Sequence, residues 1–572
     1  MKNLIRDYLA SLREREELDA ILPDMLSELG FTVISRPQRG TRQNGVDIAA
    51  VGNDNDERKL FLFSVKKGDL NRQEWDGTPQ ALRSSLDEIQ DAYIRNRIPE
   101  ELKSLKIVIC LAFGGDVQEQ VRELLTGYIA KNTTEQISFE EWNGDTLAGM
   151  ILKGILREKV LPKNLRSNFR KAVAMVDEPD VSYQHFARLA HELHKVGSES
   201  DKARLRAVRQ LNICLWILFV WARDVDNLEA PYRISELVLL SVWELLRPII
   251  GINSRELKAL DQALHQVIHL HLIIALTFIE LKILPYSSIR YGVSLAINSQ
   301  NSLDVNLALF DMLGRIGLTG VWLHWLGLQS NQENQENIRN RLLRLFHAGQ
   351  ELIRNNPGLR LPITDRQGTD IALFLQLWLV SEDNDSNPRV TSWLKEMAHG
   401  LKFSLLRREH YPSCSSDYRA LAEHPRDRSD EYFQESTAAS TLIPLIAAWL
   451  QALGQETEVK MLRELVRSEL QHCTLQLWTP NAESETMMYV GGSNHGLALC
   501  DLPLDDGGPQ LLATIAGACR TDTALKNLSP MLTGVWPVIL VACRHHHLPI
   551  PPGFWIESLI PTTTSPDEMG SV

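Results

Sequence analysis

Several features that would identify common protein classes are missing from this chain of 572 residues. Its seven cysteines include no Cys-x-x-Cys pair, which argues against a zinc ribbon or a disulfide framework and favours a reducing compartment. No phosphate-binding loop of the form GxxxxGK[ST] occurs, so we do not expect the chain to hydrolyse ATP by itself. A basic surplus is also absent. The net charge of −12 excludes a uniformly basic nucleic-acid-binding surface, although it leaves room for a local basic site.

Long hydrophobic runs are missing as well. The two most apolar runs, LNICLWILFVWA and LHLIIALTFI, are shorter than the about 20 residues that a helix needs to cross a bilayer. We therefore interpret both runs as buried helices. The first residues, MKNLIRDYLASLREREELD, carry charges throughout and contain no apolar core of a signal peptide. Together these features predict a cytoplasmic protein without a membrane partner.

What is present in residues 1–157 is a mixture of helix and strand patterns. Apolar residues from Leu18 to Leu29 recur at the i, i+3, i+4 spacing of a helix, and Gly30 ends that pattern. The whole order of predicted elements is α-β-β-β-α-β-α-β-α, which suits a mixed sheet with helices on both faces. The predicted segments are helix 12–29, strand 31–35, a hairpin within 48–65, helix 79–95, strand 106–113, helix 117–130, and a strand and helix within 137–156.

Strand patterns nearly disappear after about residue 160, and long segments with helical periodicity follow. Breaks rich in Asn and Pro, such as NNPG and EDNDSNP, separate these segments. We predict a helical domain over residues 158–385 and a second one over 386–572, or one continuous helical region. The stretch MMYVGGSNHGLALCDLPL is expected to form a small β element within it. The fold class is thus an α/β domain followed by a large, mainly α-helical C-terminal region.

The predicted hairpin in the α/β domain carries two charged residues that deserve separate interpretation. Asp47 precedes the strand IAAV, and Lys66 ends the strand LFLFSV. If the two strands are antiparallel neighbours, Asp47 and Lys66 lie side by side at one edge of the sheet. Each residue also has an ordinary interpretation, since Asp commonly forms turns and Lys commonly protects sheet edges.

Four sequence segments connect this hairpin to a known family: LSELGFTV, NGVDIAAV, LFLFSVKKGDL and ISFEEWNGDTLAGMI. In this order they resemble the PD-(D/E)xK nuclease superfamily, and within it the branch related to Mrr-type restriction endonucleases. The resemblance covers about the first quarter of the chain. It implies a restriction-endonuclease-like fold over residues 1–157 and hydrolysis of phosphodiester bonds with Mg²⁺ or Mn²⁺ as cofactor.

The same resemblance assigns roles to individual residues. Asp47 would be the principal metal ligand, the carbonyl of Val65 a second ligand, and Lys66 would orient or help to deprotonate the attacking water. An acidic residue of the first helix often joins the metal shell in this branch. Asp19 has the corresponding spacing from Gly30, with Glu17 and Glu16 as rivals.

The sequence departs from the family pattern at one position. Ser64 stands where the superfamily has Glu, Asp or, in this branch, often Gln. A hydroxyl is neutral and short, so metal affinity would fall unless Asp19, Glu17 or Asp69 compensates. This departure leaves open a nuclease-derived protein that binds nucleic acid or acts as a scaffold without cutting.

A cluster of basic residues surrounds the motif. It would neutralise several phosphates of a nucleic acid, and binding would then weaken steeply with salt. Solvated loop charges are the alternative interpretation, since most Lys and Arg side chains are exposed. The cluster consists of Arg36, Arg39, Arg42, Lys67 and Arg72.

These observations predict a metal-dependent endonuclease, with double-stranded DNA as the expected substrate and an RNA-cutting effector as a further alternative. By analogy, such nuclease domains in bacterial chains serve restriction or antiphage defence. The helical region would then regulate cleavage, with a homo-oligomer and a separate ATPase or sensor subunit as candidate partners.

The triplet His545, His546 and His547 resembles a metal cluster at first sight. Adjacent histidines on a helix point in different directions, whereas zinc ligands usually come from i, i+4 positions or from separate segments. We therefore interpret the triplet as a solvated helix end.

Overall fold

The computed structural model describes residues 5–6, 9–10, 18–35, 44–54, 57–78, 81–153, 163–249, 255–330, 332–383, 387–491, 495–499, 502, 504 and 509–560. The chain divides into two compact units. The first unit contains residues 1–238 and 252–270, and the second contains residues 239–251 and 271–572. The domain boundaries expected near residues 157 and 385 stay predictions.

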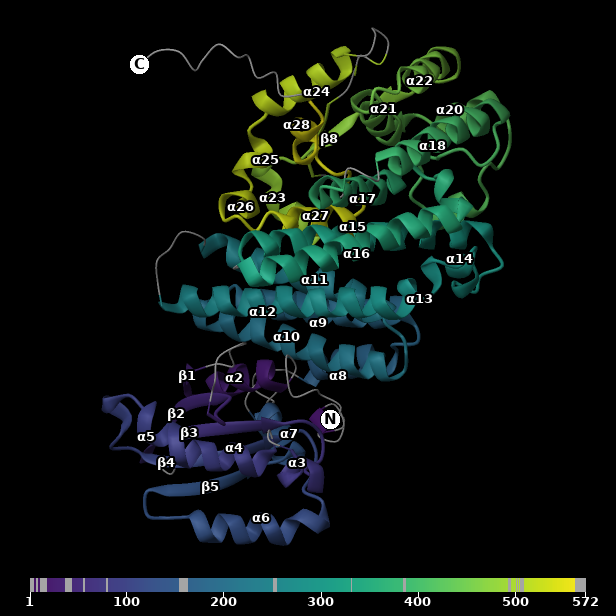
Figure 1. Cartoon of the computed structure of the whole chain (residues 1–572). Helices are drawn as coiled ribbons and strands as arrows, with labels where there is room; N and C mark the ends of the chain where they lie inside the picture. The colour runs from purple at the N-terminus through teal and green to yellow at the C-terminus, as the bar shows by residue number, and fades with distance from the viewer. Residues whose placement is uncertain are drawn as a thin grey trace. The chain divides into compact units, whose positions relative to one another are not determined.

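A five-stranded mixed sheet forms the centre of the α/β region, which is drawn in purple and blue in Figure 1. The strands follow the order β1-β2-β3-β4-β5, with antiparallel pairing from β1 to β3 and parallel pairing from β3 to β5. The predicted mixed sheet is therefore confirmed. Its strands are β1 (Thr32–Ser35), β2 (Ile48–Asp54), β3 (Glu57–Lys66), β4 (Lys106–Phe113) and β5 (Ile137–Trp142).

Both faces of this sheet are apolar because β3 and β4 are buried along most of their length. On one face, Leu60 and Leu62 belong to a core cluster that also contains Trp75, Leu86 and Val121. On the opposite face, Phe61 makes an edge-to-face contact with Phe31, and Phe63 makes one with Trp142. Side chains alternate between the faces of a strand, so consecutive residues of β3 build two cores.

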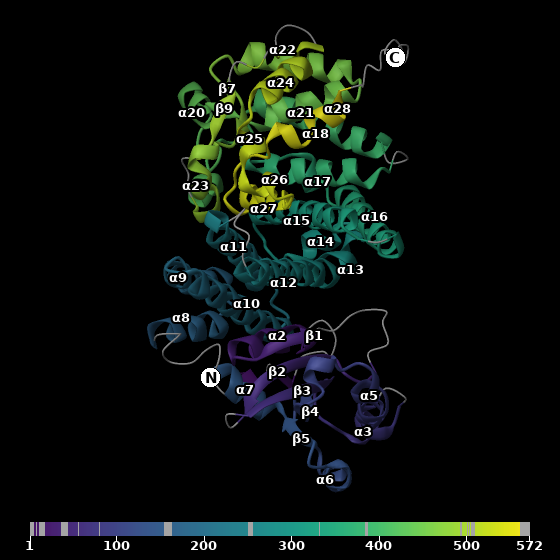
Figure 2. The same ribbon diagram turned by 90° about the vertical axis from the view of Figure 1, so that its left-hand side faces the viewer.

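Helices cover both faces, as the sequence predicted. Figure 2 shows α2 and α7 on one side of the sheet and α3 and α5 on the other. The predicted helix 79–95 is divided into α4, a short π-helical segment η2 and α5, which together extend it to residue 96. The helices of this region are α2 (Asp19–Glu28), α3 (Arg72–Asp76), α4 (Leu82–Glu88), η2 (Ile89–Tyr93), α5 (Ile94–Asn96), η3 (Glu100–Leu102), α6 (Glu119–Asn132) and α7 (Gly144–Lys153).

The remainder of the first unit is helical. Helix α10 buries the run LNICLWILFVWA almost completely, which confirms its interpretation as a buried helix. Two segments, Asp201–Asp224 and Ala259–Ser287, are long and apolar enough to cross a membrane by length and composition, with 78% and 56% of their apolar windows buried. These helices are α8 (Lys163–Ala174), α9 (Pro179–Gly197), α10 (Asp201–Asp224), α11 (Glu229–Leu246) and α12 (Arg255–Phe278), the last two continuing into the second unit.

The second unit is mainly helical and is drawn from teal to yellow in Figure 1. Its longest helix, α15, is buried along most of its length against α16 and α17. The helices are η4 (Arg247–Ile249), η5 (Ile279–Ile283), α13 (Leu284–Ser287), α14 (Gly292–Ala296), α15 (Ser302–Leu328), α16 (Gln332–Asn355), η6 (Pro357–Arg360), η7 (Asp365–Gln367), α17 (Gly368–Ser381), α18 (Asn387–Arg407), α19 (Tyr418–Ala422), α20 (Asp430–Ser436), α21 (Leu442–Ala452), α22 (Glu456–Glu469), η9 (Ala482–Ser484), α23 (Glu485–Val490), α24 (Pro509–Thr521), α25 (Ala524–Asn527), α26 (Ser529–Leu532), α27 (Pro537–His545), η10 (Pro552–Phe554) and α28 (Ile556–Leu559).

The β element expected from MMYVGGSNHGLALCDLPL differs from its prediction. Residues 485–490 form α23, and Gly491 ends that helix with a φ of 99°, a conformation that favours glycine. Within the described part of this stretch, β9 (Leu497–Leu499) is the strand, and it pairs with β8 (Leu477–Thr479) upstream of the stretch. A second two-stranded sheet joins β6 (Ala439–Ser440) to β7 (Thr474–Leu475).

Candidate active site

Asp47 lies directly before β2 and beside the end of β3. Its carboxylate Oδ2 accepts a hydrogen bond of 2.7 Å from the backbone N–H of Val65. Its own N–H donates to the carbonyl of Phe63 at 2.9 Å. The sequence predicted that the hairpin would bring Asp47 to this end of β3, and these two bonds confirm that placement.

Ser64 and Lys66 lie two residues apart on β3 and therefore share one face of the sheet. Asp47 lies just before β2. Its N–H donates to the Phe63 carbonyl although Ile48 is the residue paired with Phe63, so the alternation of faces along β2 does not extend to Asp47. Lys66 is the last residue of β3 and is only 6% exposed. Asp47 and Lys66 each make further polar or electrostatic interactions, so neither charge lacks a partner.

Ser64 differs from its two neighbours in having no such partner. It is 1% exposed, and its hydroxyl forms no hydrogen bond within the part of the chain that the structure describes. A buried polar group without a partner costs about 1–3 kcal/mol. Ser64, the residue that departs from the family pattern, thus also carries a buried oxygen atom without a hydrogen-bond partner among the described residues.

Oxygen atoms dominate the donor set at this strand end. The Asp47 carboxylate lies beside the end of β3, and Ser64 belongs to the same strand end. In a strand the N–H and C=O of one residue point to the same side, so the Val65 carbonyl also faces Asp47. Mg²⁺ prefers oxygen ligands and retains several waters, so this set fits a hard cation. Among the described residues, no group of three His, Cys, Asp or Glu side chains is gathered to hold a metal.

The loops after the parallel strands form a connected edge next to this site. The Gly115 N–H donates to the carbonyl of Gly68 at 2.9 Å, and the Gly144 N–H donates to the carbonyl of Gly115 at 2.9 Å. Asp69 Oδ1 accepts from the Asp116 N–H at 2.8 Å. Asp69, which was expected to compensate for Ser64, therefore has one carboxylate oxygen engaged in holding the loop after β4.

Sequence patterns did not indicate the role of Gly114 and Gly115, although the Gly-Gly pair at a strand end was visible. A Cβ on Gly115 would lie 2.1 Å from Asp69 Oδ1, and a Cβ on Gly114 would lie 1.9 Å from the carbonyl oxygen of Leu9. Both positions need glycine because other backbone segments approach them closely.

The two described members of the basic cluster face carboxylates. Lys67 Nζ lies 4.0 Å from Glu74, and its side chain is 63% exposed. Arg72 Nε lies 3.1 Å from Asp76 on the same short helix, α3. The Asn71 side chain accepts from the N–H groups of Gln73 and Glu74 and so begins this helix, which is absent from the predicted order of elements. The phosphate-binding role of Lys67 and Arg72 stays a prediction.

The remaining candidates lie outside the described residues or are described only in their backbone. Asp19 is the first residue of α2, which packs against β1 and β2. Figure 2 shows α2 on the side of the sheet opposite α3, whereas Ser64 and Lys66 share the face of Leu60 and Leu62, which pack with Trp75 of α3. Glu17, Arg36, Arg39 and Arg42 lie outside the described residues. The metal-binding role of Asp19 and Glu17 and the phosphate-binding role of the three arginines stay predictions.

The fold and this strand end define a class of protein: an α/β domain in which a carboxylate, a hydroxyl and a lysine meet at the end of one strand, followed by a helical region. No family model matches the chain, and neither a curated protein nor a solved structure matches it.

Proposed function

We propose that the N-terminal α/β domain is a metal-dependent endonuclease that hydrolyses phosphodiester bonds, with double-stranded DNA as its substrate. The observation that carries this proposal is the bond from the Val65 N–H to Asp47, which places a carboxylate beside the strand end that holds Lys66. The resemblance to the PD-(D/E)xK superfamily agrees with this arrangement.

Each residue has a distinct part in the proposed reaction. Asp47, the Val65 carbonyl and the Ser64 hydroxyl would hold Mg²⁺ or Mn²⁺, with Asp19 or Glu17 completing the shell. A bound divalent cation lowers the pKa of a water and neutralises charge on the scissile phosphate. Lys66 would hold the attacking water and contact the phosphate. Its position supports this role, because it lies two residues after Ser64 on β3, so both side chains are on the same face of the sheet. Lys67 and Arg72 would bind the flanking phosphates.

Cleavage assays with three variants test this proposal. The full chain is incubated with plasmid DNA and with RNA in Mg²⁺ or Mn²⁺. Asp47→Asn keeps an acceptor for the Val65 N–H but removes the charge, and Lys66→Met keeps the apolar stem. We expect each to reduce cleavage by about a hundredfold or more. Lys59→Met is the matched control, because Lys59 lies at the other end of β3 and pairs with Asp54 at 2.7 Å.

Equal cleavage by the wild type, Asp47→Asn and Lys66→Met would overturn the assignment of the site. Cleavage of RNA alone would favour the RNA-cutting effector. The proposed cellular role is restriction or antiphage defence in the cytoplasm, with the helical region regulating cleavage as a homo-oligomer or through an ATPase or sensor subunit.

A second candidate function is nucleic-acid binding without cleavage. Ser64 favours it, because a buried hydroxyl replaces the side chain that would normally reach the metal. This alternative predicts binding of DNA in a mobility-shift assay, weakened by high salt, without cleavage in any metal.

A further inference from the structure

The second unit contains a cavity of about 170 Å³ with both polar and apolar lining. Its lining comes from η7 and the start of α17, the loop at Cys414, β6 and the residue before α21, Gln476, and the turn after α27. One water needs only about 10–15 Å³ of such space. The cavity therefore has room for a ligand of several heavy atoms.

Three hydrogen-bonding side chains in this cavity are unused by the protein. Arg366, Gln476 and His547 all line it. Across the described residues, none of these three side chains makes a hydrogen bond or an ion pair with the rest of the chain. They come from different segments, so the fold brings together three groups that can donate hydrogen bonds to one ligand.

Arg366 and His547 line a cavity that is open to solvent. Both residues are exposed to solvent. Burial of the Arg366 guanidinium by the surrounding protein nevertheless lowers its pKa, and no carboxylate among the described residues offsets that effect. A cation that is crowded by protein and has no counter-ion is stabilised by a bound anion.

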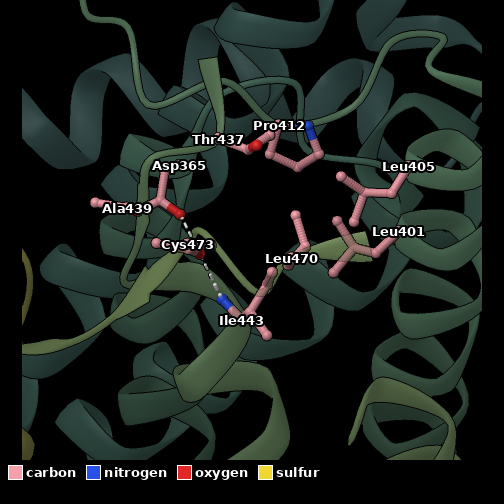
Figure 3. Close-up of a pocket in the computed structure, with 10 residues that line it drawn as sticks. Asp365, Leu401, Leu405, Pro412, Thr437, Ala439, Ile443, Leu470 and Cys473 are labelled. Atoms are coloured by element: carbon pink, nitrogen blue, oxygen red, sulfur yellow. Dashed lines mark hydrogen bonds between the residues drawn. The ribbon is translucent and has the colours of Figure 1, made fainter. Parts of the chain in front are cut away.

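Asp365, the carboxylate among the described lining residues, is already saturated with hydrogen bonds. It accepts from the Ser440 and Thr441 hydroxyls and from the N–H groups of Thr441 and Leu442, at 2.5–3.2 Å. A neighbouring cavity of only about 10 Å³ shares Asp365, and Figure 3 marks the bonds that join Asp365, Ser440 and Ile443 there. These bonds hold the Asp365 charge at the beginning of α21.

The other nearby charges are also paired. Arg544 binds Asp311, and its Nε lies 3.8 Å from Asp370. The Thr369 hydroxyl donates to the carbonyl of Leu548 at 2.9 Å, which joins the start of α17 to the turn that carries His547. Among the described residues that line the cavity, Arg366 is thus the cation that is available to a ligand.

We propose that this cavity binds the phosphate group of a small molecule. A phosphate offers three terminal oxygens, which matches the three donor side chains Arg366, Gln476 and His547. The planar guanidinium also binds phosphate oxygens in a bidentate manner. The site is independent of the proposed nuclease function, since all its residues belong to the second unit.

Calorimetric titration of the full chain tests this proposal with three probes: inorganic phosphate, adenosine 5′-monophosphate and adenosine. We expect heat of binding from the monophosphate and none from adenosine. Binding of inorganic phosphate as well would identify the free anion as a sufficient ligand. Arg366→Gln should weaken binding at least tenfold. Arg419→Gln is the matched control, because the Arg419 side chain is 88% exposed and lies away from the cavity lining.

Two results would overturn the proposal: no binding of either phosphate-bearing probe, or equal binding by wild type and Arg366→Gln. A folding defect is distinguished by the thermal midpoint of the variant, which should match that of Arg419→Gln.

His547 provides an independent readout. Although part of the His547 ring reaches solvent, crowding by the surrounding protein is the main cause that lowers its pKa to about 4. Arg366 and Arg544 lower the pKa further, Asp311 raises it and His545 lowers it. A bound anion would raise this pKa, so binding near pH 5 should take up protons and affinity should increase as pH falls. Sulfate is the probe for this measurement because it does not titrate in this range. His547 has a φ of 54°, which Asn tolerates, so His547→Asn should abolish the proton uptake.

Discussion

Ser64 and Lys66 occupy successive positions on one face of β3, but their surroundings differ. Lys66 has an interaction partner, whereas the Ser64 hydroxyl has none among the described residues. Each is almost fully buried. A buried hydroxyl that makes no hydrogen bond within the described chain is a candidate for direct contact with a ligand. The same ligand would also contact Asp47, whose carboxylate is held by the Val65 N–H.

The first prediction concerns the effect of the Ser64 hydroxyl on the free energy of unfolding. Replacing Ser64 by Ala removes a polar group that has no partner, so the free energy of unfolding should stay unchanged or increase by up to about 1 kcal/mol. Thermal denaturation without added metal measures this change. A clear drop in the thermal midpoint would mean that the hydroxyl bonds to the protein after all.

The second prediction concerns metal binding at Asp47. A cation that binds only the folded chain raises its thermal midpoint, so Mg²⁺ or Mn²⁺ should stabilise the wild type, and a chelator should reverse the effect. Asp47→Asn should abolish the stabilisation, while Ser64→Ala should reduce it. Equal metal-induced shifts in wild type and Asp47→Asn would place the metal elsewhere.

At the scale of elements, the carboxyl ends of β3, β4 and β5 are joined by backbone bonds between three glycine-containing loops. The chain after β3 and the chain after β4 approach each other closely at Gly115. Because Lys66 is the last residue of β3, the geometry of its strand end depends on these loops.

The third prediction follows from the space at Gly115. Gly115→Ala would place a Cβ 2.1 Å from Asp69 Oδ1, so the two loops must move apart. We expect a loss of about 1–3 kcal/mol and weaker cleavage. Gly127→Ala is the control, because a Cβ within α6 at that position meets nothing within 4 Å and alanine favours a helix by about 1 kcal/mol. Limited proteolysis and thermal denaturation compare the two variants.

Among the elements, the long apolar strands were the easiest to predict. The strand predicted at 106–113 coincides with β4, and the hairpin within 48–65 corresponds to β2 and β3. Helix α3 was missed because its five residues are too few to show periodicity, and only the Asn71 cap indicated it. The segment 487–490 was wrongly assigned to a β element, because MMYV has strand-like composition but packs as the helix α23.

At the scale of the whole molecule, the second unit contains several histidines that are held neutral. Burial lowers the pKa values of His324, His424, His472 and His495. Both ring nitrogens of His424 are hydrogen-bonded, one to the Tyr432 hydroxyl and the other to the Tyr411 carbonyl. Adding a proton to this ring replaces one acceptor nitrogen by a donor.

The fourth prediction concerns the pH dependence of stability. When the folded-state pKa of a histidine lies below its ordinary value, the unfolded chain binds more protons between the two values, so stability rises with pH. The contribution is complete above the ordinary pKa near 6.5 and is lost as pH falls below it. The thermal midpoint of the second unit should therefore decrease between pH 7.5 and 5 and stay level from 7.5 to 8.5. A level midpoint down to pH 5 would contradict this expectation.

The sequence alone determined the order of elements in the α/β domain, the change to a helical region near residue 160, and the meeting of Asp47 with the end of β3. These features depend on local periodicity and on a two-strand hairpin, which neighbouring residues specify. The tertiary structure alone decided that the Ser64 hydroxyl has no hydrogen-bond partner among the described residues, that Asp69 is held by Asp116, and that Arg366 and His547 share one cavity. Such features depend on contacts between segments far apart in the chain, and no local pattern encodes them.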